Sequence, residues 1–370
     1  MSIVLDFRPL QGGDSGRGIG STVRGLAGCF PELKVLLWSR KPRPTEAMGR
    51  DVVLVHGPAR RSRMSWSVDA GSSRISHSRS RHSVWHLLSA DVAYDGGGPC
   101  IVTVNDTVPW RFPDLYPMGP TGKAWMRFTA RASRQASHVV VPSHTSARDV
   151  VRFFGVAEDK VRVVPWAADP DLVIPSAEDR DRLKGVYSLP GRYFVMAGGF
   201  AHQDPRKRYV DAVNALRRVD DDVHLYVTGG AGPAAAELAR TVEQSGLSSR
   251  VHLTGFLDAS VMASLYAGAS AFVFPSLWEG FGLPVLNAFA LGVPAVVSDG
   301  GSLPEVAGGA ALVYPAGDAD ALGQQLERLL GDPALASGLI EKGRKRNLAF
   351  TWKATGALYG AVYTEAGSPS

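Results

Sequence analysis

Cysteine is scarce in this chain of 370 residues, which has only Cys29 and Cys100, far apart in the sequence. Two such cysteines exclude a disulfide framework and a cysteine-based metal cluster. No uninterrupted apolar run reaches the roughly 18–20 residues that a membrane-spanning helix needs. The first residues, MSIVLDF, have neither the basic start nor the long apolar stretch of a signal peptide. These absences predict a soluble protein of a reducing compartment.

The chain has no large excess of one charge, since it contains 40 Lys and Arg residues and 35 Asp and Glu residues. An apolar content of 45% favours packed cores and excludes a disordered chain. The net charge of +5 favours an anionic partner or substrate, although charge alone does not distinguish a nucleotide, a membrane surface and a nucleic acid. Glycine is abundant, with 41 residues, which indicates many tight turns.

Short apolar runs rich in Val, Ile and Phe alternate with helix-length segments, which predicts parallel sheets covered by helices on both faces. The expected strands cover 3–7, 34–39, 52–55, 101–105, 138–143 and 161–166, and then 193–199, 223–229, 251–255, 271–276 and 293–299. Two such series predict an α/β fold with two doubly wound domains, residues 1–172 and 192–352, joined by a linker over 173–191. One more helical pattern follows Trp352.

Residues 60–81 interrupt this alternation with six arginines, many serines and the single acid Asp69. One interpretation is a solvated surface loop. The other is a flap that contacts an anionic acceptor or a membrane surface. Trp66 and Trp85 are too few for a base-stacking platform, so no nucleic-acid partner is expected.

The loop after the first expected strand is rich in glycine. Ligands of open parallel sheets bind beyond the carboxyl ends of the strands, and Gly16, Gly18 and Gly20 precede a helix whose N–H groups can face a phosphate. A nicotinamide site and a flexible surface loop are the alternatives, but the spacing is G-x-G-x-G instead of G-x-G-x-x-G. No G-x-x-x-x-G-K-[ST] motif occurs, and the Asp-x-Asp pairs fall in expected loops, where they are weak candidates for a metal site.

The loop after strand 193–199 carries the cations Arg206, Lys207 and Arg208, just before a helix that begins near Tyr209. Clustered cations at a strand-to-helix turn suit a pyrophosphate, because a guanidinium binds phosphate with two hydrogen bonds and an ammonium acts as a point charge. A solvated basic turn explains the same residues equally well.

The loop after strand 271–276 carries Glu279 in a glycine-bounded turn before a helix expected to start near Leu283. Gly280 and Gly282 allow a ligand to approach the backbone closely. The N–H groups at the helix start can bind phosphate oxygens while the carboxylate binds hydroxyls. Alternatively, Glu279 only stabilises the N-terminus of the helix.

The run PSLWEGFGLPVLNAFALGVPAVVSDGGSLPEVAGGAALVYPAGD resembles the donor-binding core of glycosyltransferase family 4. Other blocks follow the pattern of its subgroup with many mannosyltransferases: DFRPL with GRGIG, VTVNDTVPWRFPDLYP, VPSHTSARDVVRFFGV, KVRVVPWAAD, DPRKR, VHLTGFL and FTW. The resemblance covers nearly the whole chain. It implies a GT-B fold, with two Rossmann-like domains facing a cleft. A C-terminal helix, about 353–366, would cross back to complete an N-terminal acceptor-binding domain.

The resemblance also implies an activity: retaining transfer of a hexose from a nucleotide diphosphate sugar to a hydroxyl acceptor, with no metal or other cofactor. Arg206 and Lys207 would bind the donor diphosphate, and Glu279, the first acid of an E-x7-E motif, would contact the transferred sugar. The other implied donor-binding residues are Gly16 and Gly18 over the diphosphate, Phe256 and Leu257 near the base, and Gly280, Phe281, Gly282 and Leu283 along the sugar and phosphates.

Two positions depart from the family pattern. Asn287 stands where the second acid of E-x7-E binds ribose hydroxyls, and Asn105 stands in place of a His that approaches the donor sugar. An amide keeps one acceptor and gains donors, but Asn cannot carry a proton as His does. The departures make a non-catalytic sugar-nucleotide-binding homologue the rival hypothesis, with an NADP-linked oxidoreductase as a third.

The expected substrates follow the subgroup. Mannose is the first expectation for the sugar, and a polysaccharide or glycolipid for the acceptor, with a specialised-metabolite scaffold as the alternative. No carboxylate nucleophile is apparent on the N-terminal side, which favours a front-face mechanism. The expected location is cytoplasmic, with peripheral contact at the inner membrane face through the basic 60–81 loop as an option.

Overall fold

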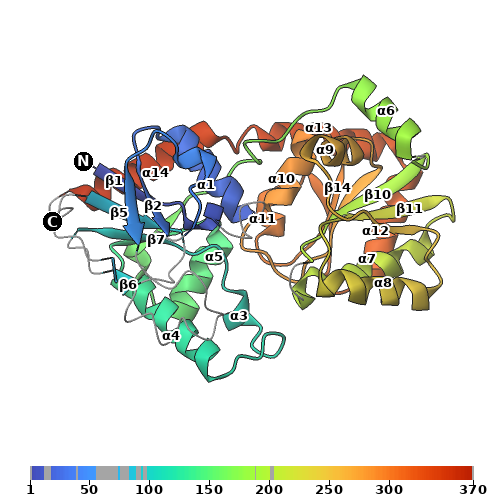
Figure 1. The fold of residues 1–370 in the computed structure, drawn as a ribbon. Helices are drawn as coiled ribbons and strands as arrows, with labels where there is room; N and C mark the ends of the chain where they lie inside the picture. Colours follow the sequence, from blue (N-terminus) through green and yellow to red (C-terminus); the bar gives the residue numbers. More distant parts are fainter. Residues whose placement is uncertain are drawn as a thin grey trace. The chain divides into compact units, whose positions relative to one another are not determined.

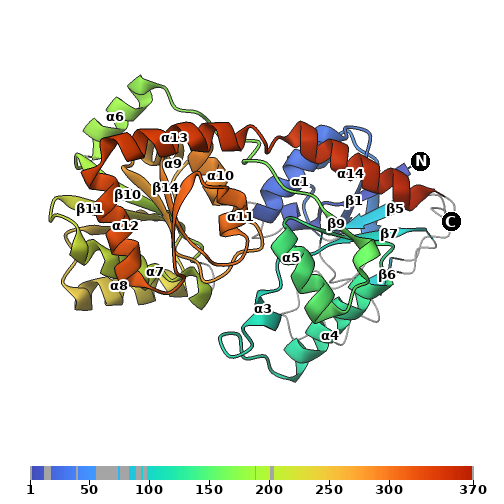
Figure 2. The same cartoon turned by 180° about the vertical axis from the view of Figure 1, so that it is seen from behind.

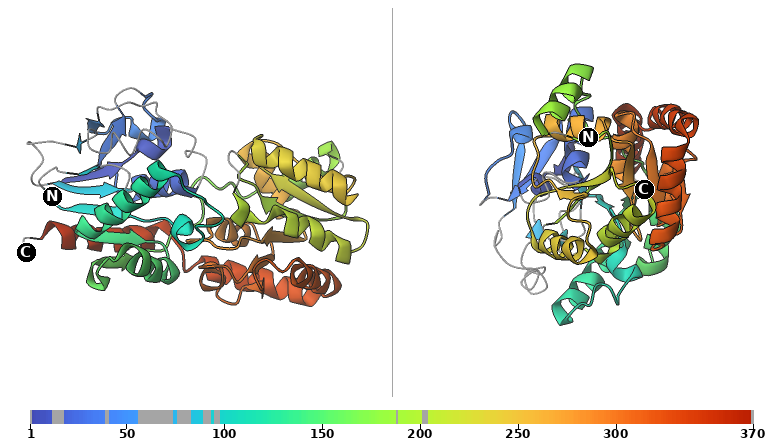
Figure 3. Two further views of the ribbon diagram at one scale, coloured as in Figure 1. Left: turned by 90° about the horizontal axis from the view of Figure 1, so that it is seen from below. Right: turned by 90° about the vertical axis from the view of Figure 1, so that its right-hand side faces the viewer.

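The computed structural model describes residues 2–11, 18–38, 41–55, 74–75, 83–88, 93–94, 98–187, 189–200 and 204–368. The chain divides into two compact units (Figure 1). The first comprises Met1–Pro170 with Phe350–Ser370, and the second comprises Asp171–Ala349. Each unit is built on one parallel sheet, and Figure 3 shows the helices packed around each sheet from two further sides.

The first unit contains a seven-stranded parallel sheet in the order β3-β2-β1-β5-β7-β8-β9. Its strands are β1 (Ser2–Asp6), β2 (Lys34–Trp38), β3 (Val52–Val55), β5 (Ser83–Leu87), β7 (Cys100–Thr103), β8 (His138–Val141) and β9 (Val161–Val163), beside a separate pair, β4 (Arg74–Ile75) and β6 (Ala93–Tyr94). Its helices are η1 (Arg8–Gln11), α1 (Gly18–Cys29), η2 (Thr45–Ala47), α3 (Val108–Arg111), α4 (Pro120–Gln135), α5 (His144–Asp149), the π-helical turn η3 (Val150–Phe154), η4 (Glu158–Lys160) and α14 (Trp352–Gly367).

Both faces of this sheet are covered. Val4 and Leu5 are neighbours on β1, and they point into different cores because successive strand residues face opposite sides. The Val4 core contains residues of α4 and η3, and the Leu5 core contains residues of α1 and α14. A strand buried on both faces has no polar side, which explains the continuous apolar runs in the sequence.

Strand β5 was not expected from the sequence, yet it lies between β1 and β7 and all five of its residues are buried. Its polar member, His86, is fully buried between two hydroxyls. Its Nδ1 lies 2.8 Å from the Tyr363 hydroxyl oxygen, and its Nε2 lies 2.7 Å from Oγ1 of Thr103. Hydroxyls both donate and accept, so they satisfy a neutral imidazole. Burial lowers the pKa of His86 from its ordinary value of 6.5 to about 3.

We expect His86 to make the stability of the first unit depend on pH. Between pH 6.5 and 3 the unfolded chain binds a proton at His86 that the folded chain rejects, so the free energy of unfolding falls as the pH falls from 6.5. One proton contributes a slope of up to about 1.4 kcal/mol per pH unit. Urea unfolding at several pH values should therefore show a shallower slope for His86→Gln. The exposed control His144→Gln should keep the wild-type slope, and equal slopes in all three proteins would contradict the assignment.

Helix α14 returns to the first unit, which confirms the expected C-terminal crossing helix; Figure 2 shows it beside α1. Thr351 caps its first turn by accepting a hydrogen bond from the Ala354 N–H at 3.2 Å. The Trp352 indole donates to the Ala168 carbonyl at 2.8 Å. The same indole occupies the space beside Gly25, where a Cβ would lie 2.3 Å from the ring. Any larger residue at position 25 would clash with this ring, so Gly25 allows α14 to pack against α1.

The second unit has a six-stranded parallel sheet in the order β12-β11-β10-β13-β14-β15. Its strands are β10 (Arg192–Ala197), β11 (Val223–Thr228), β12 (Val251–Leu253), β13 (Ala271–Phe274), β14 (Ala295–Ser298) and β15 (Ala311–Tyr314). Its helices are α6 (Ala177–Tyr187), η5 (Pro205–Lys207), α7 (Tyr209–Ala215), η6 (Leu216–Arg218), α8 (Pro233–Ser245), α9 (Ala259–Ala267), α10 (Leu283–Ala290), α11 (Leu303–Ala307), α12 (Ala319–Gly331) and α13 (Pro333–Asn347). In Figure 1, α7, α8 and α12 cover one face of the sheet, and α9 and α10 the other.

The segment 173–191, expected as an irregular linker, contains α6 and clusters with the second unit. Ser176 and Asp179 start this helix by reciprocal hydrogen bonds of 3.1 Å, each side chain accepting from the backbone N–H of the other residue. This is the arrangement of a capping box, here with Asp in place of Glu. Among the described residues, no helix is long and apolar enough to cross a membrane.

Candidate active site

The two charged loops expected from the sequence meet at one edge of the second sheet. Strands β10 and β13 are direct neighbours and run parallel, so the loops that leave their carboxyl ends lie side by side. The Leu277 N–H donates to the Arg206 carbonyl at 2.7 Å, which joins the loop after β13 to η5. The sheet order thus places Glu279 next to Arg206 and Lys207.

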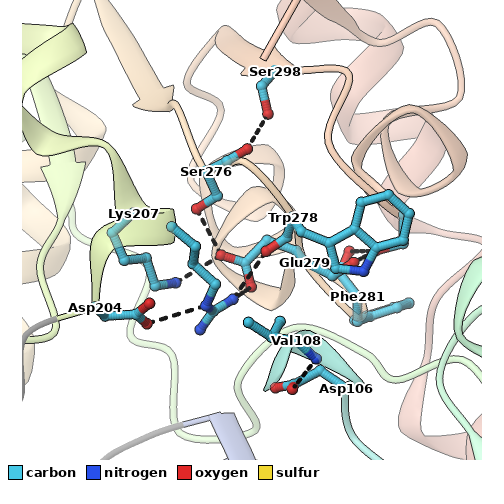
Figure 4. A network of polar contacts seen from close by, with 11 residues as sticks. Asp106, Val108, Asp204, Lys207, Ser276, Trp278, Glu279, Phe281 and Ser298 are labelled. Atoms are coloured by element: carbon cyan, nitrogen blue, oxygen red, sulfur yellow. Dashed lines mark hydrogen bonds and ion pairs between the residues drawn. The ribbon is translucent and has the colours of Figure 1, made fainter. Parts of the chain in front are cut away.

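Glu279 forms two ion pairs in this position (Figure 4). The Arg206 guanidinium donates from Nη1 to Oε2 at 2.6 Å, and the Lys207 ammonium donates to Oε1 at 2.7 Å. The Ser276 hydroxyl also donates to Oε1, at 2.7 Å. Arg206 is held further by Oδ2 of Asp204 at 3.1 Å and by the Trp278 carbonyl at 3.1 Å. The result is a carboxylate surrounded by two cations and one hydroxyl.

This carboxylate is buried, with 8% of the residue exposed. Burial acts to raise the pKa of Glu279, but the charges of Arg206 and Lys207 and the hydrogen bonds from Lys207 and Ser276 outweigh it. They lower the pKa from 4.5 to about 2. Glu279 is therefore an anion at every physiological pH, suited to accept hydrogen bonds and unsuited to act as a general acid.

The backbone around Glu279 is held by close contacts. Gly301 pairs with Glu279 in an isolated parallel bridge, and a Cβ on Gly301 would lie 2.4 Å from the Glu279 carbonyl oxygen. Gly301 also has a φ of +69°, a backbone conformation that residues other than glycine adopt only with strain. The Ser302 hydroxyl oxygen lies 2.7 Å from the Phe281 carbonyl oxygen and 3.0 Å from that of Glu279, so its single proton is donated to one of them or shared. The turn that presents the carboxylate is thus fixed on both sides of Glu279.

Arg208 holds the basic turn in shape from its other end. It has a φ of 50° and is the one non-glycine residue with positive φ in the described part of the chain. A left-handed residue costs about 1–2 kcal/mol. Its guanidinium binds the buried Asp211 carboxylate through Nε at 2.8 Å and Nη2 at 2.7 Å. This pair offsets the strain and directs Arg206 and Lys207 toward Glu279.

Other predicted donor-binding residues lie on the same unit. Gly282 has a φ of +101° and precedes α10, which starts at Leu283 as expected. Phe281 and Leu283 are buried, and Asn287 is partly exposed on α10. Leu257 is partly exposed, whereas Phe256, in the loop after β12, has 82% of its surface exposed. Their roles toward a donor stay predictions.

Two predicted residues belong to the first unit. Gly18 is the first residue of α1, and a Cβ there would meet no atom within 4 Å. Asn105 follows β7, donates from Nδ2 to the Leu88 carbonyl at 3.3 Å, and has a buried Oδ1 without a hydrogen-bond partner. Gly16 lies outside the described residues, as does the basic 60–81 segment apart from β4. No group of three or more His, Cys, Asp or Glu able to hold a metal occurs in the described ranges.

Sequence reasoning missed three residues that organise this site: Asp204, Asp211 and Ser276. Asp204 stands two residues before Arg206, and Asp211 three residues after Arg208, so their spacing from a basic turn was a usable signal. Ser276 ends the expected strand 271–276, at the carboxyl edge where ligands of such sheets bind. Its carbonyl also accepts a hydrogen bond from the Ser298 hydroxyl (Figure 4).

Comparison with known proteins agrees with this layout. Residues 191–332 match the family described as "Glycosyl transferases group 1", and residues 16–172 match "Glycosyltransferase Family 4". The MMP alpha-(1->4)-mannosyltransferase of Mycolicibacterium hassiacum is 34% identical over 256 residues, which are 67% of this chain and 59% of that protein. O-antigen chain mannosyltransferase B of Escherichia coli is 26% identical over 68% of this chain and 67% of its own length. The 2-deoxystreptamine glucosyltransferase of Streptomyces kanamyceticus is 27% identical over 71% of this chain and 69% of its own length.

Solved structures share the fold over almost the whole chain. Sucrose-phosphate synthase of Thermosynechococcus elongatus superposes with a TM-score of 0.81 at 20% identity, covering 99% of this chain and 98% of that one. Anabaena Alr3699/HepE, solved in complex with UDP and glucose, superposes with a TM-score of 0.77 at 15% identity, covering 99% and 100%. The chain belongs to glycosyltransferase family 4 and has the GT-B fold, with two Rossmann-like α/β units and a C-terminal helix that returns to the first.

Proposed function

We propose that this protein is a retaining glycosyltransferase that moves a hexose from a nucleoside diphosphate sugar to a hydroxyl acceptor without a metal ion. The observation that carries the proposal is the cluster of Arg206, Lys207 and Glu279 at the carboxyl edge of β10 and β13. Two cations beside one permanently ionised carboxylate match a donor with two phosphates and a hydroxylated sugar. The cations can also neutralise the departing diphosphate, which is the task of a metal in other transferases.

In the proposed reaction these charges stabilise the leaving group. The acceptor oxygen forms a bond to the anomeric carbon on the face from which the diphosphate leaves, while the bond from that carbon to the β-phosphate oxygen breaks. The hydroxyl proton passes to the departing phosphate oxygen. Arg206 and Lys207 stabilise the negative charge that develops there, and Glu279 accepts hydrogen bonds from the sugar.

Mannose is the first sugar we propose, because two of the relatives described above carry mannosyltransferase names. The UDP and glucose bound in the Anabaena structure support a nucleotide donor in general. For the acceptor, a growing polysaccharide or a glycolipid agrees with the name of the O-antigen enzyme. The deoxystreptamine relative favours the alternative, a glycosyltransferase of specialised-metabolite biosynthesis. Membrane contact through residues 60–81 stays part of the proposal.

The test is a panel of nucleotide sugars followed by transfer assays. A donor that binds raises the melting temperature by mass action, so GDP-mannose should raise it more than UDP-glucose, UDP-galactose or NADPH. Transfer is then measured with mannosides, lipid-linked glycans and 2-deoxystreptamine, and the anomeric configuration of the product is read by NMR. An inverted product would contradict retention. Tight donor binding without transfer or hydrolysis across the panel would instead favour the non-catalytic homologue.

Asn287→Glu tests the proposed nucleotide pose. If the residue lies at the ribose, the new carboxylate accepts two hydrogen bonds where the amide has one acceptor, and ribonucleotide affinity should rise several-fold. Calorimetry with the ribonucleoside and deoxyribonucleoside diphosphates should then show the gain for the ribonucleotide alone. A loss for both nucleotides would mean that the charge is buried without a partner and that the ribose assignment is wrong.

A further inference from the structure

A cavity of about 340 Å³ lies on the first unit, and none of the residues assigned above lines it. Its lining residues come from α3, α4 and the π-helical turn η3, which directly follows α5; Figure 2 labels α3, α4 and α5 in this part of the first unit. Its lining combines apolar and aromatic side chains with three cationic ones. The lining residues are Trp110, Lys123, Met126, Arg127, Ala130, Arg134 and Phe153. The volume falls at the lower end of the roughly 300–1,000 Å³ that small-molecule sites occupy.

The charged side chains that line this cavity are all cations. Residues 115–148 contain five cations, Lys123, Arg127, Arg131, Arg134 and Arg148, and no Asp or Glu. Lys123 and Arg127 are exposed and make no ion pair with a described residue. Arg134 also lines the cavity, and its Nη1 donates to the Phe154 carbonyl at 2.5 Å, which fixes the guanidinium there. Two uncommitted cations and one anchored guanidinium therefore face the same space.

The aromatic side chains of this lining are ordered by their neighbours. The Trp110 ring lies 5.4 Å from that of Trp125 and 4.6 Å from that of Phe154, measured between ring centroids. Phe153 has the guanidinium carbons of Arg111 and Arg152 at 5.4 and 5.2 Å from its ring centroid. Aromatic rings beside cationic side chains can bind a molecule that has an apolar part and an anionic head.

We propose that this cavity binds an amphiphile whose phosphate head carries a net negative charge, with the phosphate at Lys123 and Arg127 and the apolar part on Trp110 and Phe153. Guanidinium groups bind oxyanions through paired hydrogen bonds, which favours an anionic head over a neutral polar one. A phosphate monoester carries nearly two negative charges, which match the two cations better than the single charge of a carboxylate. This cavity shares no lining residue with the proposed donor site, and the proposal does not depend on which sugar the protein transfers.

The experiment titrates the full chain with monomeric dihexanoyl phosphatidic acid, using calorimetry and tryptophan fluorescence. Dihexanoyl phosphatidylcholine and inorganic phosphate are the comparison ligands. Phosphatidic acid should bind to one saturable site, weaken as the salt concentration rises, and bind at least about tenfold more tightly than either comparison ligand. Equal binding of phosphatidic acid and phosphatidylcholine would show that the cations do not contribute to binding. Equal binding of phosphatidic acid and inorganic phosphate would show that the aromatic side chains do not contribute. Either result overturns the proposal.

Matched charge reversals locate the binding. Arg127→Glu should weaken phosphatidic acid by at least about tenfold, whereas Arg131→Glu, an exposed residue on the same helix that does not line the cavity, should change it less than about twofold. Both side chains are exposed, so both variants should melt like the wild type. Equal losses in the two variants would show binding to the general charge of α4 and contradict a site in the cavity.

Discussion

Replacement of Glu279 by Gln should lower the rate of glycosyl transfer by at least about a hundredfold, a loss typical of removing one preorganised electrostatic group. The affinity for a free nucleoside diphosphate should stay the same or rise. Arg206 and Lys207 bind the Glu279 carboxylate directly, so the amide frees both cations for the phosphates. Steady-state kinetics and calorimetry of the same preparations measure the two quantities.

Glu243→Gln is a suitable control, because Glu243 is an exposed carboxylate on α8 of the same unit and should leave both quantities unchanged. Wild-type turnover in Glu279→Gln would assign Glu279 to structural support of the α10 turn. A fall in diphosphate affinity would show that the carboxylate positions the two cations for the phosphates and does not compete with them.

Arg206→Ala and Lys207→Ala should each weaken diphosphate binding by about 10- to 150-fold, since one charge-assisted contact to a phosphate contributes about 1.5–3 kcal/mol. Nucleoside monophosphates should lose much less. Arg240→Ala, an exposed arginine on α8, serves as the control with the same change of charge. Equal losses for the monophosphate and the diphosphate would mean that these side chains do not contact the terminal phosphate.

The same substitutions should change how stability depends on pH. In the wild type the pKa of Glu279 is about 2, below its ordinary 4.5, so its ionised form stabilises the folded state above pH 4.5 and this contribution is lost toward pH 2. When Arg206 is removed, the pKa-raising effect of burial is opposed by fewer charges, so the pKa of Glu279 rises. Urea unfolding from pH 7 to pH 4 should therefore show a smaller loss of stability in Arg206→Ala than in the wild type. An unchanged profile would contradict the electrostatic coupling.

The start of α10 and the two charged loops were predictable because local chemistry determines them. The helix start near Leu283 was predicted from the glycine-bounded turn before it, and the positive φ of Gly282 explains why a glycine stands there. The ion pairs of Glu279 were not predictable in the same way. They depend on β13 lying beside β10, and the order of strands in a sheet arises from long-range packing.

The sequence did not predict strand β5 or helix α6, and the reason differs between the two. Strand β5 (SVWHL) follows an arginine- and serine-rich segment and contains His86, so it lacks the long apolar run of its neighbours. Burial of His86 depends on hydrogen bonds with Tyr363 and Thr103, which are distant in the sequence. AEDRDRLKGVY is dominated by charge, which resembles a solvated linker, and its helix depends on the reciprocal capping by Ser176 and Asp179.

The return of α14 sets an order on synthesis at the ribosome. The sheet of the first unit is translated early, yet one of its faces is covered by Tyr359, Val362 and Tyr363, which follow the whole second unit in the sequence. Until α14 is made, this face is covered by α1 but lacks Tyr359, Val362 and Tyr363, so part of it is uncovered while residues 171–349 are translated. Translation of Phe350–Ser370 closes that face, so premature termination before it leaves a complete second unit attached to an aggregation-prone first one.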